Sequence, residues 1–156
     1  MPLEIAVDDP HAPDVGALIE RHLAWSRQVT PPGHVHALAV DALAGPGITF
    51  FGARRSGDLV GVGALKELDR AHHEIKSMHV SETARGEGVG AAIVAHLLAV
   101  AVERGSRRVS LETGATEAFA AARRLYERAG FSPCPPFAEY AEDPHSTCMT
   151  IEFTAR

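Results

Sequence analysis

The spacing of apolar residues in the first third of the chain predicts strands and one helix. Residues 3–7 alternate between apolar and polar side chains, as in a half-buried strand, and residues 13–23 carry apolar side chains at helical spacing. Residues 49–53 and 59–65 are rich in β-forming side chains and are separated by the polar segment 54–58. These two runs predict an antiparallel hairpin.

The segment between the first helix and this hairpin has a different composition. Residues 26–47 are rich in Pro, Gly and His, which predicts a loop region around a short helix at residues 36–43. A third β-rich run at residues 74–80 is expected to extend the sheet.

The second half of the chain predicts a crossover unit. Ile93, Val94, Leu97, Leu98 and Ala101 form an apolar helical stripe that ends near Gly105. A strand at residues 108–112 follows, so the strands before and after the helix should lie parallel in one sheet. A second helix at 117–129 and a closing strand at 147–153 complete the pattern. We therefore expect a layered α/β (α+β) fold in which residues 1–156 form a single domain.

Composition narrows the classes of function. The chain has 156 residues, of which 46% are hydrophobic, and a formal charge of −5. This length suits one domain, and the acidic balance argues against nucleic acid, whose binding depends on Lys and Arg. No signal peptide or membrane-length apolar tract is present, so we expect a soluble cytoplasmic protein without a membrane partner. Cys134 and Cys148 are interpreted as free thiols.

A glycine-rich loop lies between the third strand and the long helix. Its sequence is Arg85-Gly86-Glu87-Gly88-Val89-Gly90, followed by Ala91. Glycines let the backbone approach a ligand, and the free N–H groups of a helix N-terminus attract anions, so this loop predicts a pyrophosphate site.

Two other phosphate ligands are weaker interpretations of this loop. Gly86-x-Gly88-x-x-Ala91 formally fits a dinucleotide fingerprint, with Glu112 as the ribose-binding acid, but the repeated βαβ array that should follow is missing. A P-loop would require Lys followed by Ser or Thr, which the loop lacks.

Two motifs resemble the GNAT superfamily of N-acetyltransferases. Arg85-x-x-Gly88-x-Gly90 is similar to the loop by which this family binds the pantothenate and pyrophosphate of coenzyme A, and Leu125-Tyr126-x-x-x-Gly130-Phe131 is similar to a later family motif. The tail of the chain resembles a subgroup of bacterial small-molecule acetyltransferases. The resemblance implies a mixed, mostly antiparallel sheet flanked by helices, with a β-loop-α-β acetyl-CoA-binding core and acetyl-CoA as co-substrate.

The resemblance also implies roles for individual residues. The backbone of Met78, His79 and Val80 would pair with the pantetheine arm, and one N–H there would stabilise the oxyanion. Tyr126 would lie near the CoA sulfur as general acid, and Glu74 would be the general base, with Glu112 as the alternative base. The expected cofactor-binding residues are Met78, His79, Val80, Arg85, Gly86, Glu87, Gly88, Val89, Gly90, Ala91, Ala122 and Tyr126.

Some residues depart from the family pattern or stand outside it. Phe119 replaces a frequent Asn and is expected to pack instead of contacting the cofactor. Glu87 is an anion where a cation is common, so its side chain must point away from the pyrophosphate. The acceptor pocket is expected to draw on Trp25, Arg27 and Tyr140.

The histidine pairs of the chain offer no obvious metal site. His34-x-His36 and His72-His73 lack a third ligand at a matching spacing, so we interpret them as exposed loop residues and predict no metal.

The sequence thus favours acetyl transfer to a small-molecule amine by direct attack in a ternary complex. A non-catalytic acyl-CoA sensor and a dinucleotide-binding oxidoreductase remain as alternatives. The acceptor amine is not identified, and a homodimer stays an option because exposed edges of such sheets often pair.

Overall fold

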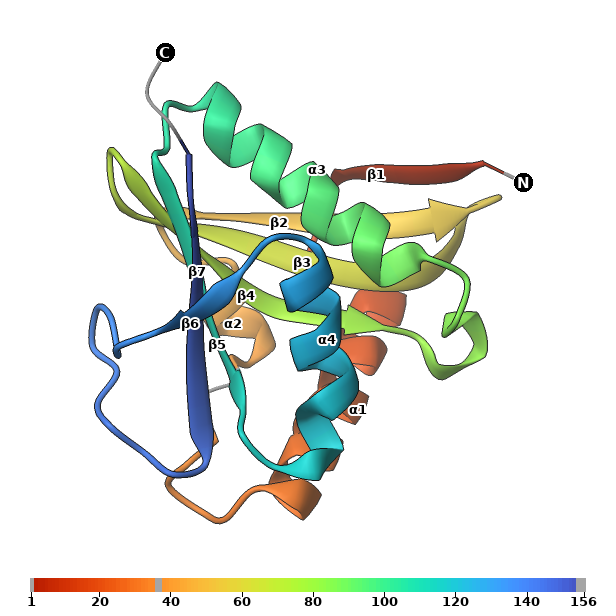
Figure 1. The fold of residues 1–156 in the computed structure, drawn as a ribbon. Coiled ribbons are helices and arrows are strands. Elements are labelled where there is room, and N and C mark those ends of the chain that lie inside the picture. The colour runs from red at the N-terminus through yellow and green to blue at the C-terminus, as the bar shows by residue number, and fades with distance from the viewer. Residues whose placement is uncertain (1, 36–37, 154–156) are drawn as a thin grey trace.

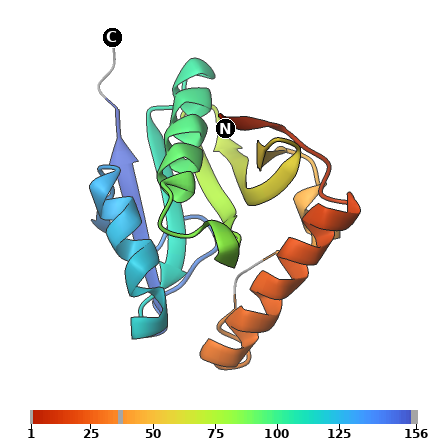
Figure 2. The ribbon, with the colours of Figure 1, turned by 90° about the vertical axis from the view of Figure 1, so that its right-hand side faces the viewer.

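A seven-stranded sheet with helices on both faces forms the framework of the computed structural model, which describes residues 2–35 and 38–153 (Figures 1 and 2). The strand order is β1-β2-β3-β4-β5-β7-β6, and every neighbouring pair is antiparallel except β4 and β5. This confirms the predicted mixed, mostly antiparallel sheet. The strands are β1 (Leu3–Val7), β2 (Ile48–Arg55), β3 (Asp58–Asp69), β4 (His72–Val80), β5 (Arg108–Gly114), β6 (Ser132–Cys134) and β7 (Ser146–Glu152).

The helices divide between the two faces of the sheet, as the side view in Figure 2 shows for the longer ones. α1 and α2 cover one face, and α3 and α4 cover the other. Each face has its own cluster of buried apolar residues. Among the described residues, no helix combines the length and the apolar character that crossing a membrane requires. The helices are α1 (Pro13–Val29), α2 (Val40–Leu43), α3 (Val89–Glu103) and α4 (Ala120–Arg128), with 3₁₀ turns η1 (Glu82–Ala84) and η2 (Glu117–Phe119).

The predicted hairpin is present, but its turn is shorter than the polar segment suggested. β2 and β3 pair up to Arg55 opposite Asp58, which leaves only Ser56 and Gly57 in the turn. Both turn residues have positive φ, 51° and 85°, as a two-residue turn of the type that matches strand twist requires. Polar residues 54, 55 and 58 therefore belong to strands.

The predicted crossover is confirmed, because β4, α3 and β5 follow one another and the two strands are parallel. α3 lies unusually close to the sheet. A Cβ placed on Gly61 or Gly63 of β3 would stand 2.7 or 2.8 Å from side-chain atoms of Ile93. Since contacts this short do not occur, glycine at these two positions allows the helix to approach β3.

Three expectations about elements were wrong or incomplete. α1 continues past residue 26 to Val29, because Ser26 is buried on the same face as Leu23 and extends the buried face of the helix. The short helix is confined to Val40–Leu43, and residues 36–37 of its predicted span lie outside the described residues. β6 was not predicted. Its Pro133 cannot donate to a ladder and is tolerated because β6 is the last strand of the sheet.

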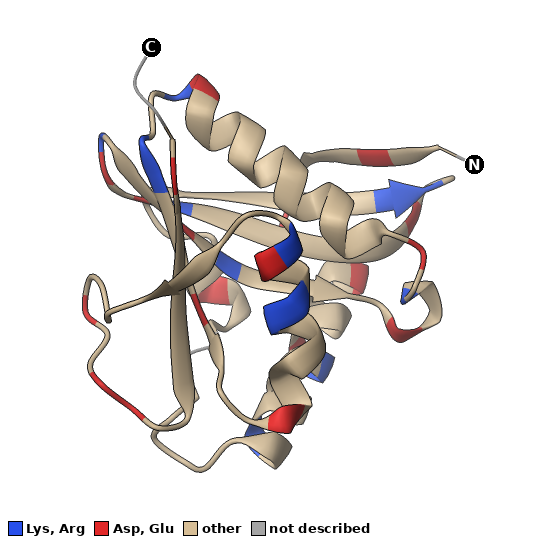
Figure 3. Ribbon diagram, in the orientation of Figure 1, with Lys and Arg blue, Asp and Glu red and all other residues tan. Residues whose placement is uncertain are grey.

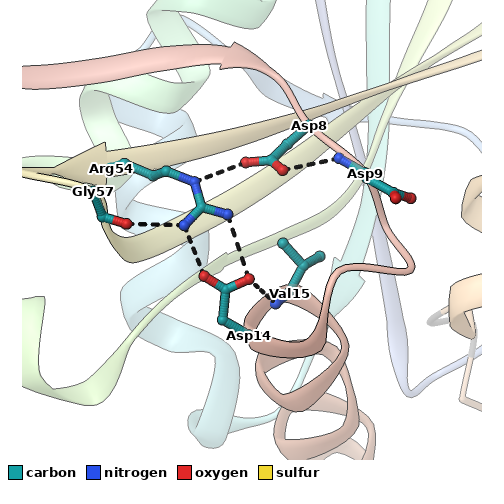
Figure 4. A network of polar contacts seen from close by, with 6 residues as sticks. All are labelled: Asp8, Asp9, Asp14, Val15, Arg54 and Gly57. Carbon is teal, nitrogen blue, oxygen red and sulfur yellow. Dashed lines mark hydrogen bonds and ion pairs between the residues drawn. The ribbon is translucent and has the colours of Figure 1, made fainter.

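A charged network joins the N-terminal elements (Figure 4). The guanidinium of Arg54 on β2 donates to the carboxylates of Asp8 at 3.0 Å and Asp14 at 2.7 Å, and to the carbonyl of Gly57 at 3.0 Å. Asp8 follows β1, and Asp14 lies in the first turn of α1. The Arg54 hydrogen bond holds the pKa of Asp14 below its ordinary value. One cation therefore ties β1, α1 and the hairpin together.

This network should contribute modestly to stability. The Arg54 side chain is 26% exposed, so replacing it with Met should lower the free energy of unfolding by about 1 kcal/mol, the upper end for solvent-accessible ion pairs. Asp14→Asn should lower stability at pH 7, where the ionised carboxylate binds Arg54. Because the folded pKa is depressed, that contribution is lost as the pH falls below the unfolded value of about 3.9.

Urea unfolding at pH 7 and pH 3 checks both expectations. Asp58→Asn, which removes an exposed carboxylate at the start of β3, controls for net charge. Equal effects of Asp14→Asn and Asp58→Asn at both pH values would contradict the role assigned to the network.

Candidate active site

The site is built around a gap in the centre of the sheet. The parallel pairing of β4 with β5 ends where Ile75 lies opposite Leu111, although β4 continues to Val80 and β5 to Gly114. Near the end of this pairing, Ser77 adopts a positive φ of 54° and the register between β3 and β4 shifts, which marks a bulge in β4. Beyond Ile75, the edge of β4 is therefore turned toward a cavity instead of toward β5.

A cavity of about 690 Å³ occupies this gap, a volume within the usual range for small-molecule sites. One end lies against the glycine-rich loop and the start of α3, and the other lies between α1, β5 and the segment before β7. We call these the loop end and the α1 end. Residues from β4, α4 and β5 line the part between them.

At the loop end, backbone groups at the start of α3 are open to the cavity. Gly88 precedes the helix with a left-handed φ of 80° and makes no side-chain cap, and no acidic residue lies in the first turn. Figure 3 shows the helix free of charged residues except at its C-terminal end. No described atom lies within 4 Å of the position that a Cβ would take on Gly86 or Gly88. The unpaired N–H groups of the first turn can therefore donate hydrogen bonds to a bound anion.

Charged residues of the loop point in different directions. Arg85 lines the cavity and brings a positive charge to it. The carboxylate of Glu87 instead forms an ion pair with Arg55 at the end of β2, and Glu87 does not line the cavity. The anionic side chain is thus kept apart from the open helix N-terminus.

Three polar side chains form a buried cluster in the middle of the cavity. Lys76 donates to the carboxylate of Glu74 at 3.1 Å and to the hydroxyl of Tyr140 at 2.9 Å. Tyr140 donates in turn to Glu74 at 2.5 Å. The side chains of Glu74 and Lys76 are only 3% and 7% exposed, so each charge depends on the other for compensation. Burial, reinforced by Glu74, raises the pKa of Tyr140, and its hydroxyl keeps its proton.

Glu112 lies beside this cluster, has a raised pKa and differs from Glu74 in its partners. Burial raises its pKa to about 7, although the hydroxyl of Ser146 and the charge of Lys76 lower the pKa and the charge of Glu74 raises it further. Among the described residues, its carboxylate forms no ion pair, whereas that of Glu74 is held by Lys76. Tyr126 of α4 lines the same cavity, and burial, reinforced by the charge of Glu112, raises the pKa of its hydroxyl. The pair combines a proton acceptor that titrates near neutrality with a phenol that stays protonated.

Aromatic side chains close the α1 end. Trp25 of α1 meets Phe119 of η2 edge to face, with ring centroids 4.9 Å apart. Phe119 lies directly over the backbone of Gly114, where an added Cβ would stand 2.0 Å from the ring. The residue that departs from the family pattern therefore packs against β5 and α1. The rings of His22 on α1 and His79 on β4 lie nearby, tilted by 40° with centroids 4.4 Å apart.

The structure gathers most of the predicted site residues around this one cavity. Glu74, Glu112 and Tyr126 all line it, as do Trp25 and Tyr140, whereas Arg27 is exposed on α1 and does not. The predicted cofactor-binding residues that line it are Met78, His79, Val80, Arg85, Gly86, Gly88, Val89, Gly90, Ala91, Ala122 and Tyr126.

Two features of the site were missed or misread from the sequence. Lys76 was not singled out, although a lysine two residues after a glutamate in an otherwise β-rich run was a usable signal for two charges on one face. The interpretation of His72 and His73 as exposed loop residues is wrong. Both belong to β4, where His72 bonds to the hydroxyl of Ser110 and His73 is buried.

A split sheet and an open helix N-terminus thus meet at one cavity that Glu112 and Tyr126 also line. Comparison with known proteins identifies the family. The family model described as "Acetyltransferase (GNAT) family" matches residues 17–131. YsnE of Bacillus subtilis (strain 168), an uncharacterized N-acetyltransferase, is 45% identical over 148 residues that cover 95% of this chain and 98% of YsnE. The chain therefore belongs to the GNAT acetyltransferase family and is an acetyltransferase, which removes the oxidoreductase alternative.

Solved structures agree with this assignment. A Klebsiella pneumoniae protein assigned as an acyl-CoA N-acyltransferase matches with a TM-score of 0.80 and 27% identity, covering 97% of this chain and 98% of that one. A GNAT acetyltransferase from Elizabethkingia anophelis, solved with acetyl-CoA bound, matches with a TM-score of 0.72 at 17% identity over 97% and 98% of the two chains. The second likeness shows the fold alone.

The adjacent histidines His22 and His79 should make the protein sensitive to acid. Burial lowers the pKa of His79 to about 3 and also lowers that of His22. An unfolded histidine binds a proton near pH 6.5, so between about pH 6.5 and 3 the unfolded state binds more protons. Stability should therefore be full above pH 6.5 and should decline with acidification, by at most about 1.4 kcal/mol per pH unit for each group.

Replacing His79 with Gln removes one of these groups. Its free energy of unfolding, measured by urea titration at several pH values, should decline less steeply below pH 6.5 than that of the wild type. His11→Gln, at an exposed position before α1, controls for the loss of an imidazole. Parallel slopes for His79→Gln and the wild type would show that His79 is protonated in the folded state.

Proposed function

We propose that this acetyltransferase uses acetyl-CoA to acetylate the amino group of a small molecule, by direct attack in a ternary complex. The observation that carries the proposal is the single cavity, which joins an anion-accepting helix N-terminus at one end to the carboxyl group of Glu112 toward the other. Tyr126 lines the wall between them. Cofactor and acceptor can therefore meet without a covalent intermediate on the protein.

The loop end suits the phosphates of coenzyme A. The open N–H groups after Gly88 and the positive charge of Arg85 would bind the pyrophosphate. The edge of β4 at Met78, His79 and Val80 that does not pair with β5 would pair with the amides of the pantetheine arm. The arm would thus occupy the position that a continued β5 would have beside β4. The acetyl-CoA-bound neighbour of the same fold supports this arrangement.

Glu112 is the better candidate for the general base. An acceptor amine arrives as an ammonium ion with a pKa of about 10.4, and its nitrogen can attack only after losing a proton. A carboxylate with a pKa near 7 is partly ionised at neutral pH and is a stronger base than an ordinary one. Glu74 shares its carboxylate with Lys76 and Tyr140, so we assign it the role of holding that cluster in place.

The negative charges that develop on the carbonyl oxygen and on the leaving sulfur also have partners in the site. The nitrogen attacks the thioester carbonyl, and a backbone N–H on the free edge of β4 would stabilise the oxygen. As the C–S bond breaks, the thiolate leaves into a buried region, where its own pKa is raised together with that of Tyr126. The hydroxyl of Tyr126 can then donate its proton to the sulfur, while Glu112 holds the first proton taken from the ammonium. The second proton, which the nitrogen loses as it becomes an amide, restores the hydroxyl of Tyr126.

The α1 end favours a small cationic acceptor. Lys76 is neutralised by Glu74, which leaves Glu112 as the acidic group available to an ammonium. Trp25 and Phe119 enclose the space with aromatic surface. A macromolecular substrate would have to displace this contact, whereas a small amine fits within the cavity.

If the glycine-rich loop binds the pyrophosphate, adding a methyl group at Gly88 should weaken acetyl-CoA binding. Gly88→Ala should weaken acetyl-CoA binding at least tenfold, because the new Cβ would project into open space where the phosphate is expected and would strain a φ of 80°. Gly105→Ala is a matched control, since Gly105 also has positive φ, 89°, and open surroundings, but follows the other end of α3.

Calorimetry with acetyl-CoA and thermal unfolding of both apo variants separate binding from strain. The two variants should lose similar stability, and only Gly88→Ala should lose affinity. Unchanged affinity in a folded Gly88→Ala variant would refute the loop assignment.

The base assignment predicts a difference between two carboxylates. Glu112→Gln should reduce kcat/KM by roughly 10²- to 10⁴-fold near pH 7 and should recover at higher pH as the amine deprotonates in solution. The acidic limb of the wild-type kcat/KM profile should fall near pH 7, the pKa of Glu112, and should disappear in this variant. Tyr126→Phe should lower kcat with little change in acetyl-CoA affinity.

Glu74→Gln serves as the comparison, because Gln can still accept hydrogen bonds from Lys76 and Tyr140. It should retain an acidic limb, displaced to lower pH, because the charge of Glu74 no longer raises the pKa of Glu112. Loss of the limb in Glu74→Gln with retention in Glu112→Gln would reverse the two roles. Tight acetyl-CoA binding without thiol release across an amine panel would favour a non-catalytic sensor.

A further inference from the structure

A group of metal-ligand side chains lies at the α1 end, apart from the residues assigned to the reaction. His34 follows α1, whereas Asp143 and His145 precede β7, and one ligand atom of each lies within 4.8 Å of the others. Nδ1 of His34 is 2.6 Å from a carboxylate oxygen of Asp143, and the rings of His34 and His145 are 4.7 Å apart. Both histidines line the cavity. Segments distant in sequence thus meet through three potential ligands.

The donor set matches one chemical class of ion. Two imidazoles and one carboxylate suit zinc and neighbouring divalent transition metals, and three protein ligands leave a fourth position open. Zn–N and Zn–O bonds of about 2.0–2.1 Å place tetrahedral donors about 3.3 Å apart. The observed spacing, from 2.6 to at most 4.8 Å, brackets this value, so small side-chain rotations would suffice.

The surroundings already orient these ligands. The Asp143 side chain is 13% exposed, and its second oxygen accepts the backbone N–H of His145 at 2.8 Å. The backbone N–H of His34 donates to the carbonyl of Pro31 at 3.1 Å, which fixes the turn that carries it. Outer contacts of this kind are what hold metal ligands in position.

An ion pair alone does not account for the second histidine. The carboxylate of Asp143 already pairs with His34 and with the backbone N–H of His145, and neither contact requires the imidazole of His145 to lie beside that of His34. A metal ion would use both rings as ligands. We propose that His34, Asp143 and His145 bind one divalent transition-metal ion, best matched by Zn²⁺, which would join the segment after α1 to the segment before β7.

The proposal concerns a binding site and does not depend on the acetyl-transfer mechanism. Protein freed of metal with EDTA and then of chelator should bind one equivalent of Zn²⁺ in calorimetry, and its Tm should rise. His145→Ala and Asp143→Asn should each weaken this binding by more than about 100-fold, because loss of even an outer-shell partner commonly costs 10- to 100-fold. His145→Ala is the safer of the two for folding, since it leaves the His34–Asp143 contact intact.

Two controls make the result specific. His11→Ala removes an exposed histidine that touches the carboxylates of Asp9 and Asp41 but has no second imidazole, so it should leave Zn²⁺ binding unchanged. Co²⁺ should give a visible spectrum without a thiolate charge-transfer band, which excludes binding by Cys134 and Cys148, the directly opposed residues of β6 and β7.

Absence of stoichiometric Zn²⁺ binding to the wild type would overturn the inference. So would undiminished binding in His145→Ala and Asp143→Asn, or a thiolate band with Co²⁺. Acetyl-CoA affinity, measured in the same samples, distinguishes this outcome from failure of the proposed function, because the cofactor is expected at the opposite end of the cavity.

Discussion

The end of pairing between β4 and β5 is the constraint on which the site depends. Two parallel strands that stay hydrogen-bonded leave no room for a ligand, and here the pairing stops at Ile75 and Leu111 while both strands continue. The bulge at Ser77 shifts the register against β3 at the same level. Backbone groups in the middle of a sheet thus become available, and unsatisfied backbone groups are costly unless a ligand or water pairs with them. These backbone groups need hydrogen-bond partners, and an extended ligand that carries amide groups can supply them.

The position of α3 is the second requirement, because the open helix N-terminus must lie at one end of this gap. Gly61 and Gly63 let Ile93 approach β3 closely, and Gly90 lets Leu125 of α4 approach the first turn of α3. Close packing holds the anion-accepting N–H groups in a fixed place. The electrostatics on the other side of the sheet follow from register. Glu74 and Lys76 share one face of β4 and neutralise each other, whereas the neighbouring Glu112 is partly buried without an ion pair among the described residues and has a raised pKa.

Local sequence was enough to predict much of this arrangement. Alternating apolar residues located β1, the hairpin and β7, and the helical stripe through Ile93 and Leu97 located α3. The glycine loop and the Tyr126 motif resembled the correct family, because both depend on short stretches of chain with fixed spacing. Glu74, Glu112 and Tyr126 were identified as candidates on the same basis, and all three line one cavity.

Only the tertiary structure decided how these groups are connected. The Lys76–Glu74–Tyr140 cluster joins residues 64 positions apart in sequence, and His34 meets Asp143 across 109 positions. Periodicity in the sequence does not report such contacts, since they depend on strand order, register and the path of loops. The same limit explains why Ser26 was assigned to a loop, because its burial in the folded protein was not visible in the sequence. The sequence by itself determined which chemical groups are present and which elements carry them, because both follow from residue type and local spacing. Distances, burial and charge compensation were decided by packing between elements that are distant along the chain.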